Sequence, residues 1–389
     1  MKIPLSYTFR SLWTRKLTTA LTIGGISLVV FVFSAMLMMA YGVEKTLVET
    51  GSPDNVIMIR KQAQAELQSQ IDRDAANIIK TEPEIALQPN GKPFLTNELF
   101  VLINIFKKGS GDMGNVTVRG VTDESMMLRP MIKITDGRTF KPGTQEIIVG
   151  SSIAKRFNGC EIGKQLKFGG SLWTIVGIFN ANGTGFDSEI WGDVEQMLPA
   201  FGRPVFSSLT FRMKDPSALD EFSKKLDSDK RLNYLELHHE KDYYAEQSRL
   251  MAQFIRIIGW IVSVLFSLGA IVGAAITMYT AVANRTVEIG TMRALGFRRR
   301  SILYAFLIES LFIALFGVAV GLFMASFLQF FVISTVNFGT FSELAFSFDL
   351  SPSIIITTLI FAIAMGIVGG FFPAVRAARL NIVNALRSA

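Results

Sequence analysis

The sequence predicts a membrane protein with four transmembrane α-helices and a large α+β extracytoplasmic domain between the first and second helices. Half of the 389 residues are apolar, and the mean hydropathy is positive. Four apolar runs contain no Lys, Arg, Asp or Glu, and each is long enough to cross a hydrocarbon core of about 30 Å. They are Leu17–Val43, Ile257–Ala283, Ser310 to about Ser342, and Leu350–Val375.

The distribution of charge predicts the orientation of the chain. The net charge is +7, yet residues 44–253 carry 26 basic and 28 acidic side chains, whereas the rest of the chain carries 13 basic and 4 acidic ones. Lys and Arg beside transmembrane helices mark the cytoplasmic side. We therefore expect a multi-pass membrane protein with both termini cytoplasmic and contact with membrane lipids. The basic residues do not indicate a nucleic-acid partner.

The sequence before the first span allows two structural interpretations. Leu5, Phe9, Leu12 and Trp13 recur at helical spacing, which favours an amphipathic helix lying in the membrane interface; an irregular basic leader is the alternative. A cleaved signal peptide is disfavoured because the first apolar run exceeds the usual signal core of about 7–15 residues. The expected divisions are an interfacial helix at 1–16, spans at 17–43, 254–283, 302–336 and 352–375, the extracytoplasmic domain with a helical stalk at 44–253, a cytoplasmic loop at 284–301, a short external loop at 337–351 and a cytoplasmic tail at 376–389.

The extracytoplasmic segment alternates strand-like and helix-like patterns. Cys160 is the only cysteine, so no internal disulfide can form, and we expect a small buried side chain there. Strands are predicted at NVIMIR, NVTVRGV, QEIIVG, SLWTIVGIF, SSLTFRM and RLNYLELH, and helices at KQAQAELQSQIDRDAANIIK, Ser151–Phe157, Asp193–Leu198 and Ser217–Leu226.

No catalytic or metal-binding constellation is evident. His238 and His239, the only histidines, are adjacent on a predicted strand, so their side chains point to opposite faces. No phosphate-binding G-x-x-x-x-G-K-[ST] loop is present, and we expect no enzyme activity and no cofactor in this chain. Glu309 alone comes near the spans; it either pairs with an arginine of the preceding loop or remains in the interfacial zone.

Small residues four apart occur in three spans and predict close helix packing, either within the chain or between copies. The pairs are Gly269 and Gly273, Gly317 and Gly321, and Gly366 and Gly370.

The loop NRTVEIGTMRALGFRRR, Asn284–Arg300, separates two apolar runs with five arginines and one glutamate. If it is helical, Ile289, Met292 and Leu295 form a modest apolar face, and Arg285 can reach Glu288 at i+3. Gly290 disfavours a helix by about 1 kcal/mol relative to Ala, which suggests a bend or a close backbone contact. Gly296 fits a helix end.

The sequence of this loop resembles a loop in the membrane domain of MacB- and FtsX-like ABC transporter permeases. In this type VII mechanotransmission family, the loop carries the pattern N-R-x-x-E-I-G-x-x-x-A-L-G. The matching residues are Asn284, Arg285, Glu288, Ile289, Gly290, Ala294, Leu295 and Gly296. The ending FPAVRAARLNIVNALR is similar to the family's terminal pattern, with Ile382 where the family often has proline. VRGVTDESMMLRPMIKITDGRTF, QEIIVGSSIAKRF and GKQLKFGGSLWTIVGIF resemble its extracytoplasmic domain.

The resemblance implies a permease subunit whose loop is a coupling helix docking on a separate cytoplasmic ABC ATPase. Ile289, Met292 and Leu295 would then supply contacts, with Arg293 also in the interface, while Arg285 and Glu288 would fix the helix ends. ATP and Mg²⁺ would be bound by the ATPase. A second permease copy, identical or related, and a periplasmic adaptor protein are further implied partners. The resemblance also implies that the chain lies in the bacterial inner (plasma) membrane.

The resemblance is compatible with several functions of this family. The MacB-like layout favours efflux or envelope export, and lipoprotein extraction or control of a cell-wall hydrolase are alternatives. A membrane-anchored sensor is a rival from another class. It predicts no ATPase partner and tolerance of changes at Ile289 and Gly290.

Overall fold

The computed structural model of the chain describes residues 16–382 and separates into two compact units. A helical unit takes the residues up to Tyr41, Gln253–Phe331 and those from Phe348 on. An α+β unit takes Gly42–Ala252 and Val332–Ser347. The expected interfacial helix at 1–16 lies almost entirely outside the described residues.

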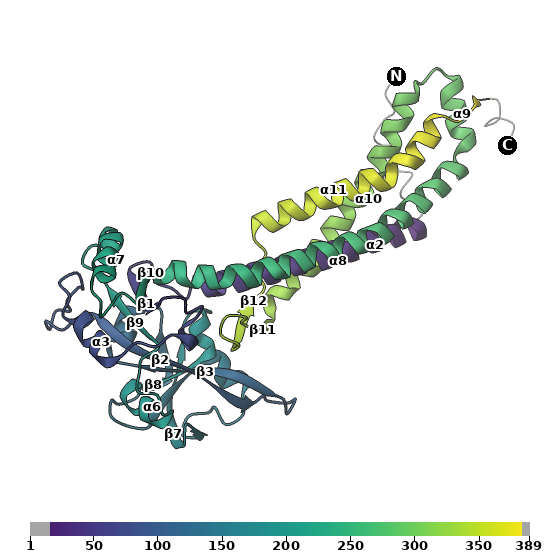
Figure 1. Ribbon diagram of the computed structural model, residues 1–389. Helices are drawn as coiled ribbons and strands as arrows, with labels where there is room; N and C mark the ends of the chain where they lie inside the picture. Colours follow the sequence, from purple (N-terminus) through teal and green to yellow (C-terminus); the bar gives the residue numbers. More distant parts are fainter. Residues whose placement is uncertain (1–15, 383–389) are drawn as a thin grey trace. The chain divides into compact units, whose positions relative to one another are not determined.

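Four helices are long and apolar enough to span a membrane, as the sequence predicts. They are α2 (Lys16–Val48), α8 (Glu240–Asn284), α10 (Arg299–Ser326), which continues as the 3₁₀ turn η4 (Phe327–Phe330), and α11 (Pro352–Ala378) (Figure 1). The short helix α9 (Thr286–Ala294) lies between α8 and α10 in the chain. The predicted fold class, four membrane helices with a mixed α and β domain, is confirmed.

The third span is shorter than the expected 302–336. The chain leaves the helix at η4 and forms β11 (Val332–Val336), which pairs antiparallel with β12 (Glu343–Ser347). β-branched residues in β11 favour an extended chain, and the Asn337 side chain accepts a hydrogen bond from the Gly339 N–H at 2.9 Å to close the turn. The expected external loop at 337–351 is therefore largely part of a hairpin that belongs to the α+β unit.

The α+β unit is built on one ten-stranded sheet with the order β10-β1-β9-β2-β3-β8-β5-β7-β4, and β6 pairs with β7. The pairs β3–β8 and β5–β7 are parallel, and the other neighbours are antiparallel. The strands are β1 (Asn55–Arg60), β2 (Leu95–Phe106), β3 (Met113–Val121), β4 (Lys133–Gly137), β5 (Glu146–Gly150), β6 (Gln165–Phe168), β7 (Ser171–Asn180), β8 (Glu189–Asp193), β9 (Ser208–Arg212) and β10 (Leu235–His239).

Short helices accompany this sheet (Figure 1). They are α3 (Arg73–Lys80), α4 (Glu124–Leu128), α5 (Ser151–Arg156), α6 (Val194–Ala200) and α7 (Leu219–Ser228), with 3₁₀ turns η1 (Glu66–Gln68), η2 (Gly185–Ser188) and η3 (Pro216–Ala218).

The six predicted strands and three of the four predicted helices are present, with small differences at their ends. The fourth predicted helix, KQAQAELQSQIDRDAANIIK, forms only η1 and α3. Ile71 interrupts it because its backbone bridges to Phe206. Trp173 and Cys160 are fully buried in the main core, which confirms the expected environment of the single cysteine.

Candidate functional site

Helix α9 is bounded by two local signals. It begins after Arg285, and its last turn is followed by Gly296 in the left-handed region, with φ +93°. The N–H groups of Gly296 and Phe297 donate to the carbonyls of Arg293 and Met292 at 3.2 and 3.1 Å. Glycine adopts this conformation without steric cost, so Gly296 stops the helix as the sequence suggests.

Arg285 connects α9 to α10 through charge. Its Nη1 lies 3.1 Å from Glu309 Oε2, and its Nε lies 3.2 Å from Glu288 Oε2. The guanidinium also stands 5.4 Å from the centre of the Phe306 ring. Arg285 and Glu309 are both buried, whereas Glu288 is exposed. Of the two readings for Glu309, pairing with the preceding arginine is the one the structure adopts.

One expected contact residue of α9 requires correction. Ile289 is fully buried and packs in the core of the helical unit, with Met292 partly buried against the same core. The side chain of Ile289 is covered by the chain's own helices, so it holds α9 against the helical unit. Leu295 is 68% exposed and Val287 is 37% exposed. Val287 on α9 and Leu295 directly after it are therefore exposed apolar side chains, whereas Ile289 is not accessible from the surface.

The remaining loop residues divide between surface and interior. Gly290 is buried, Arg293 is half-buried, and Asn284 and Ala294 are exposed.

The three glycine pairs occupy different environments. A Cβ at Gly317 or Gly321 would meet α2 at 2.6 Å, and one at Gly366 or Gly370 would meet α10 at 2.6 and 2.2 Å, so these four glycines permit helix packing within the chain. Nothing in the described residues lies within 4 Å of a Cβ at Gly269 or Gly273.

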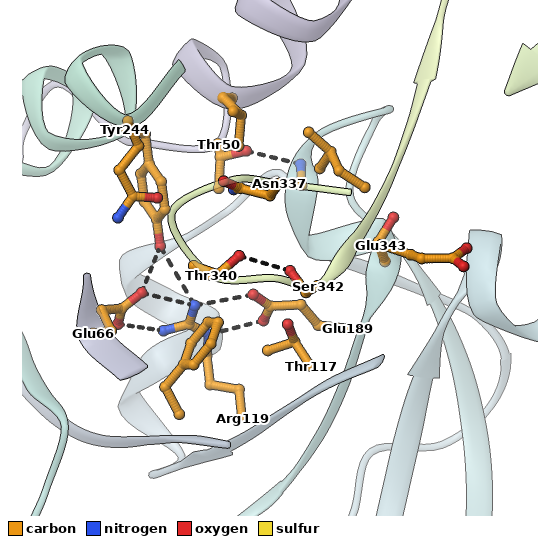
Figure 2. A pocket seen from close by; sticks show the side chains of 16 residues that line it. Thr50, Glu66, Thr117, Arg119, Glu189, Tyr244, Asn337, Thr340, Ser342 and Glu343 are labelled. Atoms are coloured by element: carbon orange, nitrogen blue, oxygen red, sulfur yellow. Dashed lines mark hydrogen bonds and ion pairs between the residues drawn. The ribbon is translucent and has the colours of Figure 1, made fainter. Parts of the chain in front are cut away.

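A buried charge cluster occupies the α+β unit (Figure 2). Arg119, on β3, donates to Glu66 at 2.7 Å, to Glu98 at 2.6 Å and to Glu189 at 2.8 Å. All four residues are buried. Each carboxylate comes from a different element, namely η1, β2 and β8, so a single guanidinium joins segments far apart in the sequence.

Arg129 extends this cluster to the first residue of α8. Its Nη1 lies 2.5 Å from Glu98 Oε1, and its Nε lies 2.9 Å from Glu240 Oε1. Glu240 also accepts hydrogen bonds from the Ser52 N–H at 3.0 Å and from the Asn55 side chain at 2.9 Å. The segment that follows α2 and the start of α8 are thereby held by the same carboxylate.

Carboxylates outnumber guanidiniums in this cluster by four to two. Burial opposes ionisation of Glu98, but Arg129 and Arg119 more than offset it and hold the pKa of Glu98 below its usual range. At Glu189 burial prevails over Arg119, and the pKa is raised. The two carboxyls therefore differ in how readily they take up a proton.

The β11–β12 hairpin packs beside this cluster within the α+β unit. Glu343 forms ion pairs with Lys107 and, at 2.5 Å, with Arg156, and the Ala345 N–H donates to Ser188 Oγ at 3.0 Å. Together with Arg119 and neighbouring side chains, the hairpin encloses a cavity of about 30 Å³, enough for one or two waters (Figure 2).

The two histidines and the single cysteine are not part of this charge cluster. His238 and His239 both lie on β10, and no group of three or more His, Cys, Asp or Glu between residues 16 and 382 is placed to hold a metal ion. Burial raises the pKa of the Cys160 thiol to about 11, which keeps it protonated at neutral pH.

This charge cluster was not predicted from the sequence. One signal was available: Arg119 stands inside the apolar strand VTVRGV, and Glu98 stands inside LTNELFVLINIF. A charged residue in the middle of a buried strand requires a partner, although the sequence alone does not say which one.

The fold defines a class, namely a four-helix membrane protein with one large α+β extracytoplasmic domain. Family comparisons make this class specific. Residues 19–229 match the MacB-like periplasmic core domain, and residues 260–382 match the FtsX-like permease C-terminal domain. The chain belongs to the MacB/FtsX-like family of ABC transporter permeases, and it is a protein of the bacterial inner membrane.

Curated relatives agree with this assignment. The chain is 26% identical over 295 residues to a macrolide export ATP-binding/permease protein, MacB 1, of Aeromonas hydrophila, covering 69% of this chain and 43% of that protein. It is 25% identical over 293 residues to MacB of Escherichia coli, covering 72% of this chain and 44% of the relative. The chain therefore spans less than half the length of the curated relatives it matches.

Two solved structures are similar in part. The extracellular domain of the ABC-type transporter YknZ from Gram-positive bacteria shares 13% identity at a TM-score of 0.36, covering 47% of this chain and 99% of that domain. The periplasmic region of MacB from Actinobacillus actinomycetemcomitans shares 12% identity at a TM-score of 0.38, covering 53% of this chain and 94% of that region.

Proposed function

We propose that this chain is the permease subunit of an ABC transporter that converts ATP hydrolysis by a cytoplasmic ATPase into motion of the extracytoplasmic domain. Both termini and α9 would lie in the cytoplasm, consistent with the basic residues that border the spans. The work would serve efflux or envelope export. Hydrolysis, ATP and Mg²⁺ belong to the ATPase in this proposal, and no catalytic residue is assigned to this chain.

One observation carries the proposal: α8 is an uninterrupted helix of 45 residues, Glu240–Asn284. At 1.5 Å per residue it is roughly 68 Å long, about twice what a hydrocarbon core needs. Its first residue is held in the buried charge cluster by Arg129, and its last residue directly precedes Arg285 and α9. A continuous helix fixed at both ends transmits displacement without bending at a loop.

The input would be α9. Its exposed apolar side chains Val287 and Leu295 suit docking on a protein surface, while the pair between Arg285 and Glu309 keeps α9 attached to α10. A push on α9 would then move the helical unit as a packed body. The ionisable residues needed for a polar path through the spans are scarce, which favours transmission of motion over passage of cargo between the helices.

A second permease copy is part of the proposal. A Cβ placed at Gly269 or Gly273 of α8 would meet no described residue within 4 Å. Small residues at this spacing allow close backbone approach in lipid, so this face is suited to a partner helix. A periplasmic adaptor would bind the extracytoplasmic domain.

The test is an affinity pull-down of the detergent-solubilised chain from its native membrane, with mass spectrometry of what co-purifies. We expect an ABC ATPase with the wild type and much less with Leu295→Asp. The control is Leu172→Asp, at an exposed apolar position on β7 of the α+β unit, which should leave the ATPase recovery close to that of the wild type. Equal ATPase recovery with Leu295→Asp contradicts docking at α9, and no ATPase with any bait favours the sensor alternative.

A further inference from the structure

The α+β unit contains a second and larger cavity, of about 380 Å³. Three parts of the fold form its walls: the strands β10 and β1, the first turns of α8, and the tip of the β11–β12 hairpin. Its volume falls within the range of small-molecule sites, roughly 300–1,000 Å³. It is therefore large enough for a ligand rather than for water alone.

The strand wall combines charge with apolar surface. Glu236 and His238 are two residues apart on β10, so their side chains share one face of the sheet. Ile59 is the partner of Glu236 in the β1–β10 register and lies beside it on that face. His238 Nε2 stands 3.5 Å from Glu236 Oε1.

The helix wall follows the period of α8. Tyr243, Glu246, Gln247 and Leu250 are spaced i, i+3, i+4 and i+7, which places them on one helical face. Leu250 is 74% exposed, and Phe338 of the hairpin tip is 50% exposed. Both line the cavity and give it an apolar surface in contact with solvent.

The charged side chains that line the cavity are carboxylates. Two carboxylates, Glu236 and Glu246, line it, and no lysine or arginine does. Glu246 makes no hydrogen bond or ion pair with any residue between 16 and 382. The lining therefore favours a positively charged ligand over an anion.

We propose that this cavity binds a small amphiphilic amine. The apolar body of the ligand packs against Leu250 and Phe338, and its ammonium group lies near Glu236 and Glu246. An anion of the same size is repelled by the two carboxylates. Binding requires no ATPase, so this proposal stands or falls independently of the proposed function.

Dansylcadaverine tests the proposal because its fluorescent ring carries sulfonamide oxygens and its pentyl chain ends in an amine. We expect saturable binding to the full chain in phosphatidylcholine nanodiscs, measured as enhanced emission above that of empty nanodiscs. N-acetylated dansylcadaverine lacks the charge and should bind at least tenfold more weakly. Equal binding of the two probes overturns the assignment of the carboxylates.

Matched variants locate the site. Glu236→Gln and Glu246→Gln should each weaken dansylcadaverine at least fivefold while leaving the acetylated probe unchanged, and Leu250→Ser should weaken both probes. Asp242→Asn removes the same charge from an exposed position on α8 outside the cavity and should have no effect. Size-exclusion profiles check that every variant folds. Unchanged binding in the double variant Glu236→Gln/Glu246→Gln refutes the site. If the oligomeric state of that variant changes while binding does not, the surface is an interface with a second copy instead.

Discussion

Replacing Arg129 with Met should destabilise the α+β unit strongly. The guanidinium is fully buried and bonds Glu98 at 2.5 Å and Glu240 at 2.9 Å. Methionine fills much of the volume but leaves both carboxylates without this cation. Removing one partner of a buried ion pair costs about 3–5 kcal/mol. For a domain of this size 1 kcal/mol corresponds to roughly 2–4 °C in the melting temperature, so we expect a decrease of about 6–20 °C.

The melting of the detergent-solubilised chain can be followed by tryptophan emission, because Arg129 lies 5.7 Å from the centre of the Trp191 ring. Arg138→Met is the matched control: Arg138 pairs with Glu146 at 2.5 Å, yet its side chain is 47% exposed. Exposed ion pairs contribute little, so this variant should melt within about 2 °C of the wild type. A similarly small change for Arg129→Met would refute the stabilising role of the buried charge cluster.

Three further outcomes follow from the structure. Burial opposes ionisation of Glu98, but Arg129 and Arg119 hold its pKa below the usual value of 4.5. The stabilising contribution of Glu98 is therefore complete above pH 4.5 and is lost as the pH falls through the lowered pKa. Glu98→Gln should reduce the dependence of the melting temperature on pH in this acidic window. Cys160 should react with maleimide in the unfolded chain and hardly at all in the folded chain, as mass spectrometry would reveal; rapid labelling of the folded chain would show that the thiol is accessible. Gly321→Leu should lower the melting temperature of the helical unit because a side chain there meets α2. Gly269→Leu should leave this melting temperature unchanged and should reduce the recovery of crosslinked dimer. The opposite pattern would reverse the two assignments.

The sequence predicted those features of the fold that depend on local pattern. The four spans follow from length and composition, and strands such as β5 and β7 follow from β-branched and aromatic runs. The longest strand, β2, was not predicted, because LTNELFVLINIF places polar and apolar residues without regular alternation. It is buried on most of both faces, so pairing with β3 and β9 rather than periodicity determines its conformation.

The same limit applies to the sites. The end of α9 could be predicted because Gly296 acts locally, and so could the pair of Arg285 with Glu288, which is one helical turn long. The inward direction of Ile289 depends on helices that pack against it and could not be read from the loop. The charge cluster joins Arg129 to Glu240 across 111 positions. Such a pair is brought together by the order of the strands, which the sequence pattern leaves open.

The claim that α8 transmits motion is tested most directly by interrupting this helix. Seven residues of Gly and Ser inserted between Arg249 and Leu250 should break its continuity, whereas seven alanines add the same length and keep it helical. A spin label at Ser110→Cys, an exposed turn position, reports the separation of the two extracytoplasmic domains in the assembled transporter, because Cys160 is buried. We predict that ATP changes the label-to-label distance in the uninterrupted chain and in the alanine variant but not in the Gly/Ser variant. An unchanged response to ATP in the Gly/Ser variant would contradict transmission through α8.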